Sequence, residues 1–184
     1  MVDVEAFLQS TGALLTGHFR LASGRHSAQY IEKFRIMEDP VATVALCGLI
    51  AERFRPTNPA TVIGPAMGGV ILSFETARHL GVHSLFTEKD ADGRHILDRG
   101  FQVKAGERVL LVDDVLTTGG SVRQVFDLLR GLGAEVIGVG FLIDRSGGAV
   151  DFGVPFFACH TMSIQSFDAD ACPLCEKGLT LIET

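Results

Sequence analysis

The stretch that decides the fold is Val109-Leu110-Leu111-Val112-Asp113-Asp114-Val115-Leu116-Thr117-Thr118-Gly119-Gly120-Ser121. Its first four residues form an uninterrupted apolar run, which is typical of a strand buried on both faces of a parallel sheet. The Thr-Thr-Gly-Gly-Ser run that closes the stretch is typical of a tight loop that opens a helix. Together the two halves predict a strand–loop–helix unit with a pair of carboxylates at the junction.

Each half of this stretch suits a different chemical group. The carboxylates of Asp113 and Asp114 can accept hydrogen bonds from vicinal hydroxyls. The loop from Thr117 to Ser121 offers backbone N–H groups, hydroxyls and the positive end of a helix dipole, which together suit a phosphate. A ligand with a diol at one end and a phosphate at the other, such as ribose 5-phosphate, would satisfy both. The alternatives are a phosphate loop of another class and a strand that merely ends in two solvated aspartates.

The rest of the chain alternates helix and strand patterns. This alternation predicts an α/β fold with a mostly parallel central sheet and helices on both faces, whose ligands bind beyond the carboxyl ends of the strands. We expect a single domain over residues 1–184, with a small hood formed by about 1–39 and 152–184. The pattern predicts helices over 4–15, 41–54, 70–80 and 122–132, strands over 61–63, 82–86, 108–112, 136–143 and 155–158, a loop over 90–100, and a turn at Ser23-Gly24-Arg25.

Composition and charge narrow the class of protein. The chain has 184 residues, is 47% hydrophobic and carries a formal net charge of −6, which argues against non-specific nucleic-acid binding. No run approaches the ~18 apolar residues of a membrane span. The start, Met1 to Glu5, lacks the basic and apolar regions of a signal peptide. We therefore expect a cytoplasmic protein that binds small molecules and neither nucleic acid nor membrane.

The stretch 109–121 resembles the motif for 5-phosphoribosyl-1-pyrophosphate (PRPP) of the type I phosphoribosyltransferases. The resemblance implies their fold, with the Asp pair on the ribose hydroxyls and the loop on the 5′-phosphate. Gly64-Pro65-Ala66-Met67-Gly68-Gly69 falls at the family's pyrophosphate loop, where many members carry a Lys that this chain lacks. Read without the resemblance, that segment is equally a plain turn between strand and helix. The implied PRPP-binding residues are Ala66, Met67, Gly68, Gly69, Lys89, Asp113, Asp114, Val115, Leu116, Thr117, Thr118, Gly119, Gly120 and Ser121, of which Lys89, Asp113 and Asp114 are the implied catalytic residues.

Three further features are similar to the orotate phosphoribosyltransferases. Residues 17–25 match Gly-x-Phe-x-Leu-x-Ser-Gly-Arg, with Ala22 in place of a common Lys. Arg145 matches an Arg whose guanidinium forms paired hydrogen bonds with a planar carboxylate. Lys89 matches a Lys on a mobile loop that reaches into the neighbouring subunit's site. Without the resemblance, a surface salt bridge explains Arg145 and a solvated side chain explains Lys89.

This chain departs from the family pattern around the mobile loop and the base. Glu88 stands where many members have Arg, and Asp92 falls near a second expected Lys. Arg94 and His95 are the other cationic candidates in that loop. Tyr30 occupies a position that holds one of two paired aromatic residues over the base in many members.

The resemblance implies that the 5-phosphoribosyl group is transferred from PRPP to orotate, giving orotidine 5′-monophosphate and pyrophosphate in pyrimidine (UMP) biosynthesis. It implies that Arg145, Thr117 and Tyr30 hold orotate. It also implies Mg²⁺ carried by PRPP rather than by direct protein ligands, and a homodimer with shared active sites. The alternatives are another type I phosphoribosyltransferase, acting on a purine or uracil, and a non-catalytic regulator that binds PRPP.

The cysteines add one open question. Cys172-Pro173-Leu174-Cys175 is a C-x-x-C pair, and a structural zinc site would need two more ligands. Cys159-His160 are the only candidates nearby in the sequence, and the six histidines form no ligand spacing. We therefore expect a reduced pair with a structural or incidental role.

Overall fold

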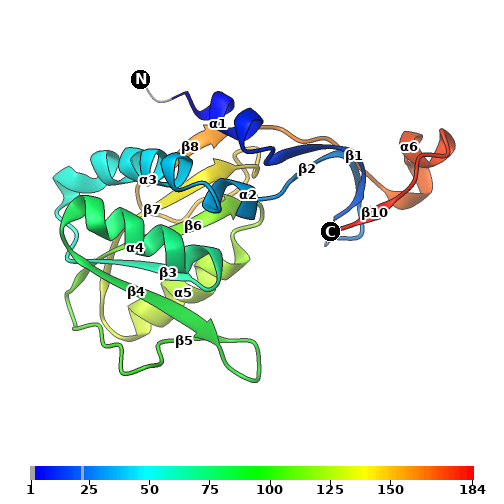
Figure 1. Ribbon diagram of the computed structural model, residues 1–184. Coiled ribbons are helices and arrows are strands. Elements are labelled where there is room, and N and C mark those ends of the chain that lie inside the picture. Colours follow the sequence, from blue (N-terminus) through cyan, green and yellow to red (C-terminus); the bar gives the residue numbers. More distant parts are fainter. Residues whose placement is uncertain (1–2, 22) are drawn as a thin grey trace.

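The computed structural model describes residues 3–21 and 23–184 and contains two β-sheets with helices packed on them (Figure 1). The larger sheet has six strands in the order β5-β4-β3-β6-β7-β8, and the smaller has four in the order β10-β1-β2-β9. The larger sheet is parallel except for its β4–β5 pair, which confirms the predicted α/β class. The elements are α1 Val4–Ser10, β1 Leu14–Arg20, β2 His26–Ile31, α2 Phe34–Met37, α3 Pro40–Phe54, β3 Thr61–Pro65, α4 Gly68–Leu80, β4 His83–Lys89, β5 His95–Ile96, β6 Arg108–Leu116, α5 Gly120–Gly131, β7 Glu135–Asp144, β8 Phe156–Thr161, β9 Ser166–Phe167, α6 Pro173–Glu176 and β10 Ile182–Glu183.

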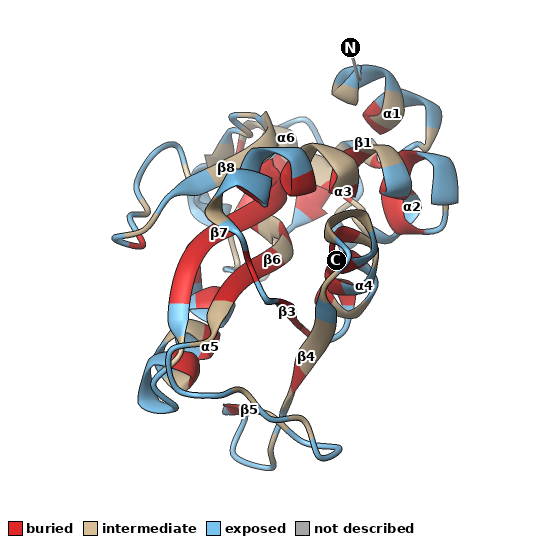
Figure 2. Cartoon of the chain, turned by 90° about the vertical axis from the view of Figure 1, so that its left-hand side faces the viewer, coloured by how far each residue is buried: buried red, intermediate tan, exposed pale blue. Residues whose placement is uncertain are grey.

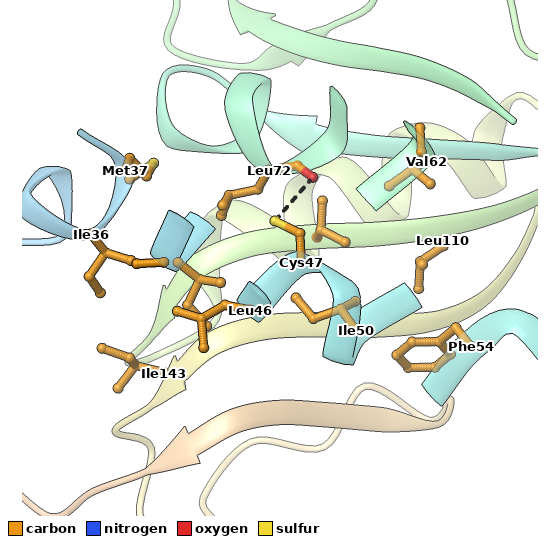
Figure 3. Close-up of a cluster of buried hydrophobic side chains, with 14 of the residues drawn as sticks. Ile36, Met37, Leu46, Cys47, Ile50, Phe54, Val62, Leu72, Leu110 and Ile143 are labelled. Carbon is orange, nitrogen blue, oxygen red and sulfur yellow. Dashed lines mark hydrogen bonds between the residues drawn. The ribbon is translucent and has the colours of Figure 1, made fainter. Parts of the chain in front are cut away.

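Each face of the larger sheet is buried under its own helices. Successive residues of a strand point to opposite faces. Val62 and Leu110 accordingly join one apolar cluster with α3 and α4, part of which is drawn in Figure 3. Ile63 and Leu111 join a second cluster with α5 on the other face. The central strands β3, β6 and β7 are the most completely buried, as the red of β6 and β7 in Figure 2 shows, and this burial explains the apolar runs in their sequences.

The first predicted helix is shorter than its apolar spacing indicates. Helix α1 ends at Ser10, and Leu14 and Leu15, which we assigned to that helix, begin β1. Gly12, with φ of +66°, breaks the helix between them. The spacing of the two leucines therefore matches the helical period by coincidence.

Two boundaries near the carboxyl edge of the larger sheet also differ from prediction. Strand β4 continues to Lys89 and pairs with β5, so the segment 90–100, predicted as a loop, contains a strand. Strand β6 continues to Leu116, so the aspartates lie within the strand. The sequence hides both extensions because charged residues, Glu88-Lys89 in β4 and Asp113-Asp114 in β6, interrupt the apolar run that marks a buried strand.

The smaller sheet joins the two ends of the chain (Figure 1). Strands β1 and β2 form a hairpin whose turn has Gly24 at φ +79°, and the tail strands β10 and β9 pair with its two outer edges. We call these four strands the hood sheet. Residues 156–161 form the predicted last strand and pair with β7 in the larger sheet, although they fall within the range 152–184 given for the hood. Ala22 lies outside the described residues, as do Met1 and Val2.

The structure changes the surroundings of the C-x-x-C pair from those its sequence neighbours offer. Cys159, one of the two candidates near it in the sequence, lies on β8 with its Sγ 3.4 Å from the Leu46 carbonyl oxygen. The rings of His18 and His26, which no spacing in the sequence connects to the pair, lie against Cys175 instead. No helix within residues 3–21 and 23–184 has the length and apolar character needed to cross a membrane.

Candidate active site

One cleft at the carboxyl edge of the larger sheet is lined by the Asp-rich end of β6 and the loop that follows it. It measures about 250 Å³ and includes Asp113, Val115, Leu116 and every residue from Thr117 to Ser121. A larger hollow of about 540 Å³ lies at the opposite edge, where Thr61 and His83 begin their strands. Because ligands of parallel sheets bind at the carboxyl ends of the strands, the smaller cleft is the candidate site.

The loop presents a helix N-terminus with unused amide donors. Helix α3 is capped by the Asp39 side chain, which accepts from Val41 N and Ala42 N at 2.9 and 3.3 Å. The described residues give α5 no such side-chain cap, because its N-cap position is Gly119, at φ +75°. The first N–H groups of α5 are therefore available to an anion. The hydroxyls of Thr117, Thr118 and Ser121 surround this end and are exposed.

The two aspartates have different surroundings. Asp114 is 5% exposed, and its carboxylate accepts from Val115 N at 2.7 Å and pairs with Lys33 Nζ at 2.8 Å. Burial and the charge of Asp114 raise the pKa of Asp113 to about 7, against the opposing effect of Lys33. The free cleft thus holds one well-compensated carboxylate and one that accepts a proton near neutral pH.

The glycine segment packs directly on this pair. A Cβ added to Gly68 would lie 2.1 Å from Asp114 Oδ2, and one added to Gly64 would lie 2.4 Å from the Gly69 carbonyl oxygen. Glycine at these positions therefore lets the start of α4 approach both β3 and the aspartate. Ala66 and Met67 are joined by a cis peptide bond, and Met67 is 73% exposed. The predicted pyrophosphate loop thus adjoins the Asp pair.

Arg145 stands beside the same cleft at the end of β7. Its backbone N–H donates to the Leu116 carbonyl at 2.8 Å. Burial lowers the pKa of its guanidinium, and the nearby Tyr30 acts in the opposite direction. Its Nε is buried and has no hydrogen-bond partner among the described residues. A half-buried guanidinium with an unused donor suits a planar carboxylate.

Lys89 lies apart from this group. It is exposed at the end of β4, on the β4–β5 hairpin that projects from the larger sheet (Figure 1). The other charged residues of the hairpin pair with one another. Glu88 makes two hydrogen bonds of 2.8 Å with Arg99, and Arg94 pairs with Asp90 at 3.0 Å.

Comparison with known proteins settles the family. Residues 36–152 match the model of the phosphoribosyl transferase domain. The orotate phosphoribosyltransferase of Desulforamulus reducens is 49% identical over 173 residues, which cover 94% of this chain and 90% of that protein. The chain belongs to the orotate phosphoribosyltransferase family. The family member from Thermotoga maritima is 47% identical over 176 residues, covering 96% of this chain and 94% of that protein. The crystal structure of orotate phosphoribosyltransferase from Aeropyrum pernix superposes with a TM-score of 0.75 at 29% identity, covering 87% of this chain and 94% of that one.

The resemblance read from the sequence is thus confirmed at the level of the family. In this orotate phosphoribosyltransferase the fold brings the Asp pair, the glycine segment and the phosphate loop together, with Arg145 and Tyr30 beside them. It does not place Lys89 in contact with them. His95, the other cationic candidate of the hairpin, is buried with its Nδ1 2.9 Å from Thr87 Oγ1, so it supports the hairpin.

One residue of this site, Lys33, was not predicted from the sequence. Lys33 follows β2 and reaches Asp114 from the hood side. Burial lowers the pKa of Lys33, but the hydrogen bond to Asp114 and the charges of both aspartates raise it above its ordinary value. The scarcity of lysine was the available signal, since the chain has only Lys33, Lys89, Lys104 and Lys177 and its proposed ligand is a polyanion.

Proposed function

We propose that this chain, as a single phosphoribosyltransferase domain in the cytoplasm, transfers the 5-phosphoribosyl group from PRPP to orotate. The products are orotidine 5′-monophosphate and pyrophosphate, in pyrimidine (UMP) biosynthesis. The main support for the proposal is Arg145 Nε, which is buried and has no hydrogen-bond partner among the described residues. It lies beside the cleft that we propose as the binding site of ribose 5-phosphate. Orotate carries a planar carboxylate, which a guanidinium binds through paired hydrogen bonds. Purine bases and uracil carry no carboxylate.

Each part of the site has a separate task. Thr117 to Ser121 anchor the 5′-phosphate through the free end of α5, and Asp113 and Asp114 accept from the ribose hydroxyls. As the bond from C1 to pyrophosphate loosens, positive charge builds on the ribose ring, and the orotate nitrogen attacks from the opposite face. The reaction needs no protein nucleophile, so catalysis consists of positioning and of stabilising the leaving group.

Mg²⁺ fits this arrangement as an ion that PRPP brings with it. The oxygens of Asp113 and Asp114 and the loop hydroxyls are hard donors of the kind Mg²⁺ prefers, although Lys33 already occupies one carboxylate oxygen. We therefore assign the ion to the phosphate oxygens of PRPP, with the acidic pair favouring a cation nearby. Bound there, Mg²⁺ neutralises charge on the pyrophosphate.

A turnover assay tests the proposal as a whole. We expect pyrophosphate release from PRPP with orotate, and none with adenine, xanthine or uracil in its place. Turnover of one of those bases would instead indicate a purine or uracil phosphoribosyltransferase. PRPP binding without any pyrophosphate release would indicate a regulator.

The affinity for PRPP should depend on pH through Asp113. Its pKa of about 7 means that below this pH the free protein holds a proton where a ribose hydroxyl must donate. The dissociation constant for PRPP, measured by calorimetry, should therefore fall as the pH rises from about 6 to 8, at most about tenfold per pH unit below the pKa. Asp113→Asn is the control, because the ionisation of PRPP itself remains in that variant. An identical pH profile in both proteins would contradict the assignment.

The same raised pKa makes a prediction about stability. An unfolded chain ionises Asp113 near 4, so between about 4 and 7 the folded state binds the proton more tightly and the free energy of unfolding falls as the pH rises. Asp113→Asn should therefore raise the unfolding midpoint at pH 8 and change it much less at pH 4, where the unfolded chain also begins to bind the proton. A thermal unfolding series across this pH range, without ligand, makes the measurement.

We propose a homodimer formed through α3 and α4. Exposed apolar side chains gather there around a groove of about 410 Å³, including Val44, Ile71 and Phe74, the last 64% exposed. Monomers rarely leave such patches uncovered, and two-fold symmetric pairing is the commonest way to bury them. In such a dimer the exposed Lys89 side chain is available to the active site of the neighbouring subunit.

Phe74→Glu should break this dimer, because it places a charge in an apolar interface. We expect sedimentation velocity to show monomers at concentrations where the unmodified protein is dimeric. Leu132→Glu is the matched control, because Leu132 is 43% exposed and follows α5 on the opposite face of the sheet. Unchanged sedimentation of Phe74→Glu would place the interface elsewhere.

A further inference from the structure

Two histidines and two cysteines meet where the C-terminal tail crosses the β1–β2 hairpin. The ligand atoms of His18, His26, Cys172 and Cys175 all lie within 4.8 Å of one another. His18 Nε2 is 3.0 Å from His26 Nδ1, and Cys175 Sγ is 3.3 Å from His26 Nδ1. Both sulfurs lie 3.7 Å from His18 Nε2. The four atoms thus form a closed group with short separations.

These separations match the edges of a zinc tetrahedron. With Zn–S of about 2.3 Å and Zn–N of about 2.0–2.1 Å, tetrahedral geometry places ligand atoms about 3.3–3.8 Å apart. The four separations given above, 3.0 to 3.7 Å, need only small adjustments to reach these values, and all four ligand atoms lie within 4.8 Å of one another. Two cysteines spaced C-x-x-C with two histidines are also a known ligand set of structural zinc sites.

The hairpin is shaped to present both rings. Thr16 pairs with Gln29 and Phe19 with Ser27, so β1 carries one extra residue between these pairs, in a bulge that includes His18. After the bulge, Arg20 pairs with His26. Because side chains alternate along a strand, His18 and His26 share the face on which Arg20 lies.

A hydrogen bond outside the group fixes the orientation of His18. Its Nδ1 lies 2.9 Å from the carbonyl oxygen of Leu179, which can only accept, so Nδ1 carries the proton. The lone pair of Nε2 therefore points at the two sulfurs and at His26. Zinc-binding histidines almost always donate their other ring N–H in this way.

The tail needs a stabiliser other than an apolar core. Within residues 161–184 only Cys172 is buried, and neither apolar cluster includes a residue beyond Ile164. Its elements β9, α6 and β10 are two to four residues long. For segments this short and exposed, the free energy gained by burying apolar surface does not offset the conformational entropy lost on folding. A bound metal adds its binding free energy directly to the free energy of folding.

We propose that His18, His26, Cys172 and Cys175 bind one Zn²⁺ in a closed, four-coordinate structural site that fastens the tail onto the hood hairpin. With four protein ligands it leaves no open position for catalysis. The tail held by this site also carries Ser166, whose hydroxyl accepts from Arg25 Nε at 2.9 Å next to the hairpin turn. The proposal does not depend on which base the enzyme uses.

Metal analysis of the full-length protein, purified without chelators, tests this site. We expect about one zinc per chain by elemental mass spectrometry, and its release when a mercurial reagent blocks the thiols. The protein refolded with Co²⁺ should show the visible absorption bands of tetrahedral cobalt together with thiolate charge transfer. Unmodified protein that neither contains zinc nor takes it up in reducing buffer overturns the proposal, as does a Cys172–Cys175 disulfide in the freshly isolated enzyme.

Variants localise the metal. Cys175→Ser is the informative one, because Cys175 is exposed and its replacement disturbs no packing. It should lose the zinc, and mass spectrometry after brief proteolysis should find new cleavage between residues 166 and 184. Cys159→Ser is the matched control and should keep about one zinc per chain. Zinc retained in Cys175→Ser overturns the assignment. If that variant does not fold, cleavage of the same tail in the chelated wild-type enzyme supports the clamp, and its resistance overturns it.

Discussion

Replacing Lys89 by alanine is expected to lower kcat about 10²–10³-fold, the scale of losing one key charge stabiliser in the transition state. The site needs this charge, because Met67 and Gly68 stand where many family members have a Lys, and Lys33 is already engaged by Asp114. The Lys89 side chain is exposed and makes no hydrogen bond or ion pair with the residues that the structure describes. The KM values should therefore change much less than kcat, and the unfolding midpoint should stay constant.

Steady-state release of pyrophosphate measures the effect of this substitution. Lys104→Ala is the matched control, because Lys104 lines the hollow at the amino ends of the strands, away from the candidate site. A loss of substrate binding and thermal stability in proportion to the loss of kcat would mean that Lys89 is structural.

A mixing experiment shows whose site Lys89 serves. Lys89→Ala and Asp113→Asn are each expected to be nearly inactive alone. If Lys89 crosses to the neighbouring subunit, a mixed dimer contains one intact site, so an equimolar mixture should recover up to about a quarter of the wild-type rate after subunit exchange. No recovery, in a mixture shown to have exchanged subunits, would place Lys89 in the site of its own chain.

Replacing Arg145 by alanine is expected to raise the KM for orotate about 10–100-fold, since a hydrogen bond to a charged group contributes about 1.5–3 kcal/mol. The guanidinium is half-buried beside the cleft, and its unpartnered Nε leaves a donor for the orotate carboxylate. The KM for PRPP should change little, because the residues proposed to bind the ribose and the phosphate lie on β6 and at the start of α5.

Arg145→Lys is the control for the geometry of this contact. Lysine keeps the charge but lacks the planar fork, so it should restore only part of the orotate affinity. Full restoration by Lys would mean that charge alone is recognised. Equal weakening of orotate and PRPP in Arg145→Ala would remove Arg145 from the base site.

The buried strands and the phosphate loop could be predicted because their information is local. The apolar run of β6, the Asp pair and the glycine-rich turn are contiguous, and Asp39-Pro40 marks the start of α3 within two residues. The predicted end of the first helix was wrong because Leu14 and Leu15 continue the helical apolar spacing beyond Gly12, where the helix has already ended.

Contacts between distant segments could not be predicted in the same way. Lys33 meets Asp114 across 81 positions of the chain (114 minus 33), and Gly68 is needed there only because the Asp114 carboxylate occupies its Cβ position. The hood presents the same problem on a larger scale. Nothing in the spacing of His18 and His26 indicates that the segment around α6 brings two thiols to them.

The pairing of β1 with β10 has a consequence for the order in which the molecule forms. Phe19 on β1 precedes its strand partner Ile182 on β10 in the chain, and every strand of the larger sheet lies between them. The larger sheet is complete at β8, so a nascent chain can assemble it while the hairpin still lacks both flanking strands. Closing so long a loop is slow relative to local contacts. The hood sheet is therefore completed only after β10 has been synthesised, and a chain that stops before β10 carries an assembled larger sheet beside an incomplete hood sheet.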